Sequence, residues 1–379
     1  MTKKLTIETG LNPDNKRIVL VLQGGGALGA YQAGVYHALH EHDLTPDWVV
    51  GTSIGAINAA IIAGNSSENR VSKLREFWDR MSHSDPIDLS KIPDGVRRFN
   101  IALSTADTML RGVPGFFSPR YFSLFAAGFE VDPEAASFYD TSALGKTLNA
   151  LVDFDYLNAE GGTRLTVNAM KVTTGELVSF DNRKQTIRAE HIMASGALPP
   201  GFPPVRLDGD LYWDGGLYSN TPLETVLDDQ SQVDTLSFMV DLWSAHGAEP
   251  TTLGGVQTRQ KDVMFASRSS RHIEAYIKTH KLQHSLRELA GHLTPEQKKL
   301  LDPELLNSMG ADSTIHIVRL AYAGRDWNMP SKDVNFSAGS TNWRWNQGYR
   351  DASRAIEGAD WLTTVSEDTA LVVHELLPY

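Results

Sequence analysis

The chain has 379 residues, including 35 Lys and Arg, 46 Asp and Glu and no cysteine, which gives a formal net charge of −11. The absence of cysteine excludes disulfides, thiolate metal sites and a cysteine nucleophile. The acidic surplus argues against nucleic acid as a partner, and 41% hydrophobic residues are typical of a folded globular protein.

The N-terminal residues 1–16 are polar, and we expect them to form a loose tail. No apolar run follows Lys3 and Lys4, so no secretory signal is predicted. The longest apolar stretch, residues 54–64, is far shorter than the roughly 20 residues of a membrane span. These features predict a cytoplasmic protein, and peripheral contact with a membrane is left open.

Two strand–turn–helix units follow the tail. Residues 17–23 form a continuous aliphatic run typical of a strand buried on both faces, followed by a glycine turn and a helix over 30–40. A second short strand over 47–51 leads into a helix of small residues over 54–63. This repetition predicts an α/β fold with a mainly parallel sheet.

The remaining pattern is less regular. An amphipathic helix is predicted over 69–81, and residues 82–140 are rich in aromatic and turn residues, as in a segment that packs on the body or covers something. Further strands are predicted over 163–170, 176–180, 205–207, 211–213, 235–241 and 314–322, and further helices over 189–195, 257–293 and 340–358. Asp208-Gly209 is expected to form a hairpin turn between two of these strands.

The segment Gly51-Thr52-Ser53-Ile54-Gly55 places a serine between two glycines where a buried strand turns into a helix. Such a turn exposes the serine hydroxyl at the end of the sheet, while the helix start offers amide groups to a developing oxyanion. Ser53 is therefore the candidate nucleophile. Its alternative role is a helix N-cap, for which serine is also favoured.

The run Gly24-Gly25-Gly26-Ala27-Leu28-Gly29 follows the first strand and has the spacing of a dinucleotide-binding turn. That site expects a carboxylate at the end of the next strand, where this chain has Ser53. The backbone N–H groups of this loop would instead face Ser53 as an oxyanion hole. A glycine turn that only permits close helix packing is the alternative.

Asp214 follows a predicted strand and precedes Gly215 and Gly216, so it is the candidate base for Ser53. An ordinary Asp-Gly turn is the alternative, although Asp208-Gly209 already accounts for the hairpin. A Ser-acid-His arrangement would use one of 12 histidines, of which His246 is best placed after a strand. His280 and His284 have metal-pair spacing without a third ligand, so no metal is assigned.

Taken in order, the Gly24–Gly29, Gly51–Gly55 and Asp214–Gly216 segments resemble the patatin-like phospholipase family. The block from Ala194 to Val205 is similar to the proline-bearing segment that precedes the family's Asp motif. The resemblance implies a three-layer α/β/α fold, no cofactor, Ser53 as nucleophile, Asp214 as base, and an oxyanion hole at Gly24, Gly25 and Gly26. Its motif glycines are Gly29, Gly51, Gly55, Gly215 and Gly216. Members often carry Arg or Lys where this chain has Leu28.

The resemblance covers roughly residues 17–242, the expected catalytic domain with an aromatic-rich insertion at about 82–140. Residues 243–379 are expected to form a helical extension with a late strand packed on the same body. Within it, Arg344-Trp345-Asn346-Gln347-Gly348-Tyr349 resembles an extra C-terminal region of a bacterial subset of the family.

The implied function is hydrolysis of lipid carboxylic esters through an acyl-enzyme. The alternatives are a short-chain esterase, a polyester-oligomer depolymerase, a catalytically inactive lipid-binding or regulatory module, and a nucleotide-binding protein. The expected partner is a lipid or acyl-ester substrate. The basic stretch over 257–293 could contact lipid head groups or another subunit, so self-association is also left open.

Overall fold

The computed structural model describes residues 11–12, 15–83, 104–121, 128–229, 233–266, 268–302, 313–323, 330–362 and 369–375. The strands are β1 (Arg17–Leu22), β2 (Trp48–Gly51), β3 (Ser118–Pro119), β4 (Tyr139–Asp140), β5 (Arg164–Lys171), β6 (Leu177–Asp181), β7 (Val205–Leu207), β8 (Asp210–Asp214), β9 (Thr235–Asp241), β10 (Ile315–Ala321) and β11 (Leu371–Glu375).

The α-helices are α1 (Ala30–Glu41), α2 (Ile54–Ala63), α3 (Ser67–Met81), α5 (Ser142–Leu151), α6 (Phe154–Asn158), α7 (Ala189–Ser195), α8 (Leu223–Leu227), α9 (Leu253–Phe265), α10 (Ser269–Gly291), α11 (Pro295–Lys298) and α13 (Ala338–Gly358). Short 3₁₀ helices are η1 (Gly26–Gly29), η4 (Pro133–Ala135), η5 (Gly215–Leu217), η6 (Lys332–Val334) and η7 (Asp360–Leu362).

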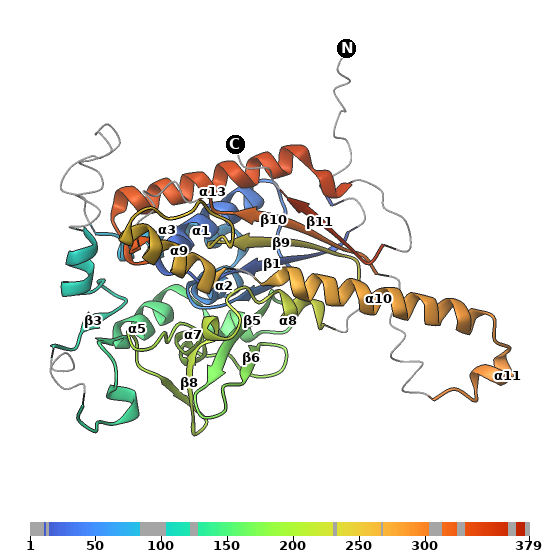
Figure 1. Ribbon diagram of the computed structural model, residues 1–379, viewed down its shortest axis with the longest axis horizontal. Coiled ribbons are helices and arrows are strands. Elements are labelled where there is room, and N and C mark those ends of the chain that lie inside the picture. Colours follow the sequence, from blue (N-terminus) through green and yellow to red (C-terminus); the bar gives the residue numbers. More distant parts are fainter. Residues whose placement is uncertain are drawn as a thin grey trace, which may run out of the picture.

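The central sheet is mixed and mostly parallel (Figure 1). Its order is β11-β10-β9-β1-β2-β5-β8-β7, and β6 also pairs with β5. Every neighbouring pair from β11 to β5 is parallel, whereas β6, β7 and β8 run antiparallel to their partners. The hairpin between β7 and β8 turns at Asp208 and Gly209, whose φ values of 49° and 95° confirm the predicted turn.

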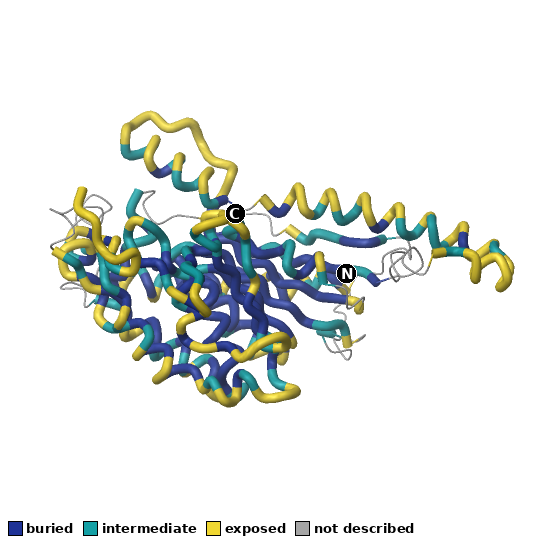
Figure 2. Tube along the Cα trace, turned by 90° about the horizontal axis from the view of Figure 1, so that it is seen from below, coloured by how far each residue is buried: buried dark blue, intermediate teal, exposed yellow. Residues whose placement is uncertain are grey.

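Successive residues of the buried strands face opposite layers of helices, as the two-residue period of a strand requires. Leu20 and Leu22 of β1 belong to a core shared with α1, α2, α3 and α13. Val19 and Val21 of the same strand pack with α8, and the first part of α10 joins that second core. Buried residues accordingly fill the middle of the molecule (Figure 2). The predicted three-layer α/β/α fold is confirmed.

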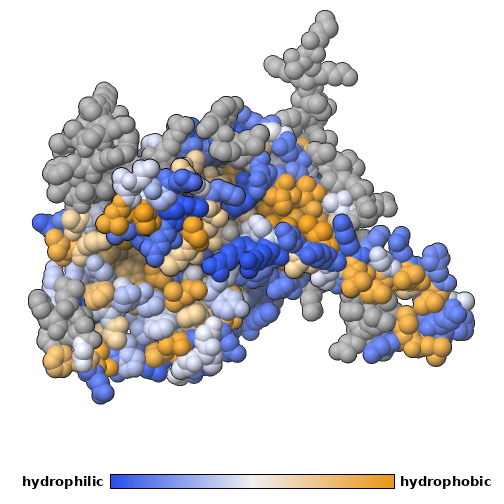
Figure 3. Space-filling view, viewed as in Figure 1, coloured by the Kyte–Doolittle hydropathy of each residue, from blue (hydrophilic) through white to orange (hydrophobic). Residues whose placement is uncertain are grey.

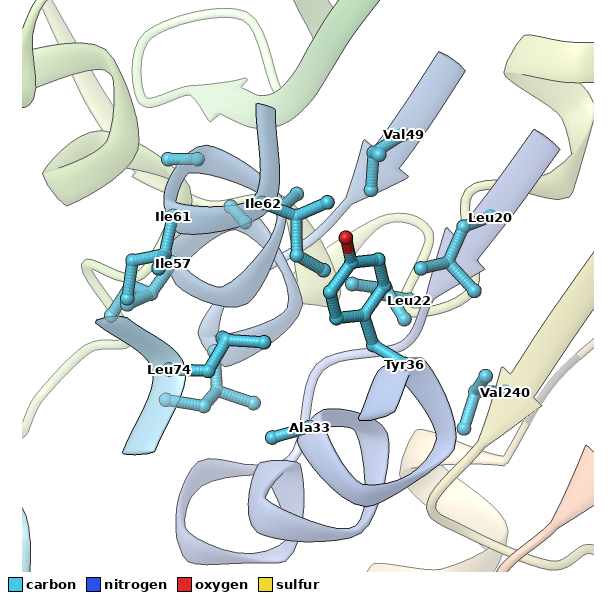
Figure 4. Packing of buried hydrophobic residues seen from close by; sticks show 14 of the residues in the cluster. Leu20, Leu22, Ala33, Tyr36, Val49, Ile57, Ile61, Ile62, Leu74 and Val240 are labelled. Atoms are coloured by element: carbon cyan, nitrogen blue, oxygen red, sulfur yellow. The ribbon is translucent and has the colours of Figure 1, made fainter. Parts of the chain in front are cut away.

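The helix α2 is buried along its whole length. Its side chains meet those of β1, β2 and α1, as Figure 4 shows for Ile62, Leu22, Val49 and Tyr36. Apart from Asn58, whose side chain donates to the Gly29 carbonyl, this helix consists of alanine, glycine and isoleucine, whose small or apolar side chains permit close contact on every side. The start of α2, and with it Ser53, is thereby fixed at the end of β2.

The C-terminal part of the chain joins the same sheet and helical layer. The strand β10 lies beside β9, and α13 packs along α1. The two helices approach very closely, since a Cβ atom on Gly34 would collide with the carbonyl of Trp345 and one on Gly348 with that of Tyr31. The glycine of the Arg344–Tyr349 segment is therefore required by helix packing.

The prediction of a single helix over 257–293 is wrong, because two helices, α9 and α10, occupy this region. Ala266 leaves the helical conformation with φ −58° and ψ 147°. The carbonyl of Phe265 accepts hydrogen bonds from the side chains of Gln23 and Asn220 instead of continuing a helix. Helix α9 therefore ends beside Gln23, the residue before the glycine loop, and Asn220.

Helix α10 extends well beyond the rest of the molecule (Figure 1). Ile273, Tyr276 and Ile277 pack against the sheet, whereas Leu282 and Leu289 farther along are exposed. Figure 3 shows hydrophobic and hydrophilic residues intermixed on the projecting end. No helix within the described residues is both long enough and apolar enough to span a bilayer.

The aromatic-rich insertion contributes to the core where it is described. Phe116 and Phe117 are buried and their rings contact that of Phe202. Tyr121 and Phe129 are exposed, and Phe99, Phe122 and Phe125 lie outside the described residues, as do residues 1–10 of the expected tail. Part of this segment is therefore ordinary core.

Candidate active site

Ser53 lies in the sharp turn between β2 and α2 with φ 57° and ψ −124°. This conformation is rare for a residue with a side chain and costs on the order of 1–3 kcal/mol. The residue occupies the N-cap position, but its side chain makes no capping hydrogen bond, so the alternative role as a helix cap does not apply. The hydroxyl is left available for chemistry.

The two glycines around Ser53 are required by the tightness of the turn. A Cβ atom on Gly51 would collide with the carbonyl of Gly55, and one on Gly55 with the carbonyl of Leu22. Their absence of side chains lets the start of α2 press against β1 and β2. The glycine–serine–glycine pattern therefore builds the predicted turn.

Asp214 ends β8 and is 2% exposed. Its Oδ1 accepts a hydrogen bond of 2.7 Å from the Gly216 N–H, and the Ser53 side chain lies near enough to the carboxyl group to affect its pKa. Burial raises the pKa of Asp214 to about 7, against the smaller opposing effects of the Ser53 side chain and the Gly216 N–H. A carboxyl group that can gain or lose a proton near neutral pH thus lies beside the serine.

A second serine supports the turn. The N–H of Ser53 donates to both the carbonyl oxygen and Oγ of Ser195, at 3.1 and 3.0 Å. Ser195 is fully buried at the end of α7, and its hydroxyl donates to the carbonyl of Asn168 in β5 at 2.7 Å. Ser195 therefore connects the turn at Ser53 to two neighbouring elements, α7 and β5.

The glycine loop lies next to Ser53, because a Cβ atom on Gly24 would be 3.0 Å from the Ser53 Cβ. The N–H of Gly24 donates to the carbonyl of Asn220 at 3.0 Å, whereas the N–H groups of Gly25 and Gly26 have no hydrogen-bond partner among the described residues. The candidate oxyanion donors are thereby reduced from three to Gly25 and Gly26.

The orientation of the first of these donors is fixed by side chains outside the loop. The Gly24 carbonyl accepts hydrogen bonds from Trp243 Nε1 at 2.8 Å and Asn220 Nδ2 at 3.1 Å. Since the C=O and N–H of one trans peptide point in opposite directions, these bonds also set the direction of the Gly25 N–H. Leu28, at the position where a cation is common in the resembling family, is fully buried in the core.

The other candidate residues do not join this cluster. His246 lies on an exposed turn, where its backbone N–H contacts Ser244 Oγ. No group of three His, Asp or Glu residues that could hold a metal ion occurs within the described residues. A surface hollow of about 470 Å³ between Asn65, Lys73 and residues 149–155 contains none of the candidate catalytic residues.

The sequence did not single out Ser195, Asn220 or Trp243 as site residues. Ser195 falls within the proline-bearing block Ala194–Val205, and its place in that block is the one sequence feature that could have indicated a role in the site. Asn220 and Trp243 act through their side chains on a loop about 200 positions away in the chain. The role of Trp243, which follows β9, depends on the sheet order that places β9 beside β1.

These features together define an α/β protein with a serine in a sharp strand–helix turn, a buried aspartate and a glycine loop. A family model described as patatin-like phospholipase matches residues 20–227, and a second one, described as patatin phospholipase, matches residues 263–368. The chain belongs to the patatin-like phospholipase family. The resemblance seen in the three sequence motifs is thereby confirmed.

Among curated proteins, the chain is 28% identical over 211 residues to an uncharacterized NTE family protein of Mycobacterium tuberculosis, covering 55% of this chain and 28% of that protein. It is also 35% identical over 77 residues to a triacylglycerol lipase of Schizosaccharomyces pombe, covering 20% and 16%. The chain thus matches less than a third of the length of either relative.

Among solved structures, VipD from Legionella pneumophila aligns over 94% of this chain and 71% of its own, with a TM-score of 0.40 and 16% identity. Human GIVD cytosolic phospholipase A2 aligns over 90% of this chain and 59% of its own, with a TM-score of 0.37 and 10% identity.

Proposed function

We propose that the protein is a lipid acyl hydrolase that cleaves carboxylic esters with Ser53 as nucleophile and Asp214 as general base. The observation that carries this proposal is the position of the Ser53 side chain beside the buried Asp214 carboxyl group, whose pKa is raised to about 7 by burial. Membership of a phospholipase family and the similarity to a triacylglycerol lipase support a lipid ester as substrate.

In the proposed reaction, Asp214 accepts the Ser53 proton as Oγ attacks the ester carbonyl carbon. The N–H groups of Gly25 and Gly26 receive the negative charge that develops on the carbonyl oxygen. The tetrahedral intermediate then collapses, the alcohol leaves with the proton from Asp214, and an acyl-Ser53 ester remains. A water molecule deprotonated by Asp214 attacks this ester and releases the carboxylic acid and the free serine.

The proposal is tested with a panel of p-nitrophenyl esters from acetyl to palmitoyl, together with a phospholipid substrate. Ser53→Ala should lower hydrolysis by about 10³-fold or more, because no other group takes over the nucleophile's role. Ser72→Ala, an exposed hydroxyl on α3, is the matched control and should leave the rate unchanged. Full activity in the Ser53→Ala protein would refute the mechanism.

The same panel distinguishes the alternative functions. A preference for long acyl chains supports a lipase or phospholipase, whereas activity confined to acetyl and butyryl esters supports a short-chain esterase. Mass spectrometry after treatment with a fluorophosphonate should locate the adduct on Ser53. A folded protein that binds lipid vesicles but neither reacts with the fluorophosphonate nor hydrolyses any ester would be an inactive lipid-binding module.

A further inference from the structure

Arg344 of α13 is completely buried, at 0% exposure, and its guanidinium binds backbone carbonyls from two separate segments. It donates hydrogen bonds of 2.9 Å to the carbonyl oxygens of Ala27, Asn335 and Lys332. Ala27 belongs to η1 in the glycine loop, and the other two residues flank or begin η6. One side chain from the C-terminal helix therefore joins η6 to the loop beside Ser53.

The two joined segments also touch directly. Gly26 adopts φ +54°, and a Cβ atom there would collide with the carbonyl of Asp333 in η6. Glycine is needed at this position both for the positive φ and for the close approach of η6. The backbone conformation at Gly26 is thus constrained by its contact with η6.

Two charged pairs also join η6 to α9. Lys332 Nζ lies 2.5 Å from Asp262 Oδ1, and Lys261 Nζ lies 2.8 Å from Asp333 Oδ1. The Lys332 ammonium also lies 4.9 Å from the centre of the Trp243 ring, the ring that binds the Gly24 carbonyl. Through Arg344 and these charged pairs, α9, η6 and the glycine loop are thus joined by contacts between adjoining segments.

A guanidinium suits this position better than an ammonium group. Its planar fork presents five N–H donors in fixed directions, so it can serve several carbonyl oxygens at once, whereas a lysine offers a compact charge on a flexible stem. Replacing it with lysine preserves the charge but not the simultaneous connection of η1 and η6.

We propose that Arg344 is a positioning residue for the oxyanion hole, and that holding the glycine loop in its reactive shape is a role of the C-terminal region. This inference rests on the proposed function, because it assigns Gly25 and Gly26 as the oxyanion donors. A loop whose amides move by a fraction of an ångström stabilises the transition state less well while still admitting substrate.

The test compares Arg344→Lys with Arg70→Lys. Arg70 is the matched control because it is 4% exposed, lies in α3 and also donates to a backbone carbonyl, that of Asn65, at 3.0 Å. For Arg344→Lys we expect kcat to fall by about 10- to 100-fold with little change in KM. Hydrogen–deuterium exchange should also become faster in a peptide that covers residues 23–29. Arg70→Lys should change neither kcat nor exchange in that peptide.

Two results would overturn the inference. The first is a kcat for Arg344→Lys equal to that of Arg70→Lys together with unchanged exchange in the loop. The second is a loss of activity that follows only the fraction of folded protein, with equal losses in both variants. If the lysine variant does not fold, Arg344→Gln replaces it, because its neutral amide keeps an NH2 group with two donors and leaves no buried charge.

Failure of this inference and failure of the proposed function give different results. Activity that survives in Ser53→Ala removes the proposed function, while loop exchange in the Arg344 variants still reports whether Arg344 holds the loop. Normal Ser53-dependent activity combined with an unchanged kcat in Arg344→Lys removes only the positioning role.

Discussion

The backbone N–H of Ser53 is shared between two acceptors of Ser195, its carbonyl oxygen and its Oγ. Because the Ser195 hydroxyl also donates to the Asn168 carbonyl, the strained φ of Ser53 is supported by α7 and β5 as well as by its own strand and helix. The shape of the turn thus depends on residues more than 100 positions away.

Ser195→Ala should therefore impair both folding and catalysis. Removing the hydroxyl leaves the buried Asn168 carbonyl without this donor, at a cost of about 1–3 kcal/mol in the free energy of unfolding. Greater freedom of the Ser53 backbone should lower kcat by about 10-fold. Ser82→Ala, which removes a similar hydroxyl-to-carbonyl bond at the end of α3, should leave kcat unchanged. Equal kcat values in the two variants would contradict the supporting role.

The pH dependence of hydrolysis should follow the Asp214 carboxyl group. A general base must be ionised, so kcat/KM should fall about tenfold for each pH unit below a pKa of about 7 and level off above it. Asp214→Asn should remove this dependence together with most of the activity. A profile that stays flat from pH 8 to pH 5 in the wild-type enzyme would show that another group is the base.

The same carboxyl group should make the folded protein less stable as the pH rises. Its folded pKa of about 7 exceeds the ordinary value of 3.8, so the folded state binds this proton more tightly than the unfolded chain does. The stability contributed by the protonated group is complete below about pH 4 and is lost as the pH rises through 7.

Asp214→Asn should consequently be more stable than the wild type at pH 8. Its advantage should grow by about 2–3 kcal/mol in the free energy of unfolding between pH 5 and pH 8. Urea denaturation at both pH values measures this difference. An advantage that is the same at pH 5 and pH 8 would mean that burial does not raise the pKa of Asp214.

The indole of Trp243 should matter for turnover beyond its contribution to packing. Trp243→Phe removes the donor to the Gly24 carbonyl, a loss of about 0.5–1.5 kcal/mol that should lower kcat by about 2- to 10-fold. Trp361→Phe makes the same change at another buried indole that donates to a backbone carbonyl, that of Leu11. Steady-state kinetics should show a lower kcat in Trp243→Phe alone, and equal kinetics would argue against a role in orienting the loop.

The N-terminal half of the site could be predicted because its signals are local. An aliphatic strand, a glycine turn and a helix follow one another in both units, and β1, α1, β2 and α2 lie within a few residues of their predicted bounds. The pairing of Ser53 with Asp214 came from ordered motifs that resemble one family, since no local pattern indicates that two distant residues meet.

What the sequence could not predict depends on tertiary contacts. The sequence between α9 and α10 contains no proline or glycine that would predict a break. At this point the Gln23 and Asn220 side chains bind the Phe265 carbonyl, which a continuous helix would use for its own hydrogen bond. In the same way, Arg344 lies in a charged and aromatic segment whose sequence is typical of the exposed face of a helix. Its burial becomes evident only once α13 lies along α1.

The position of β9 between β1 and β10 has a consequence for shortened forms of the protein. All seven residues of β9 are buried, and Asp241 at its end pairs with Arg319 of β10 at 2.7 Å. Without β10, β9 would become an apolar edge strand with a row of unsatisfied amide and carbonyl groups. Truncation before Ile315 should therefore produce aggregation through strand addition between molecules, even though the Ser53 and Asp214 segments would both be present.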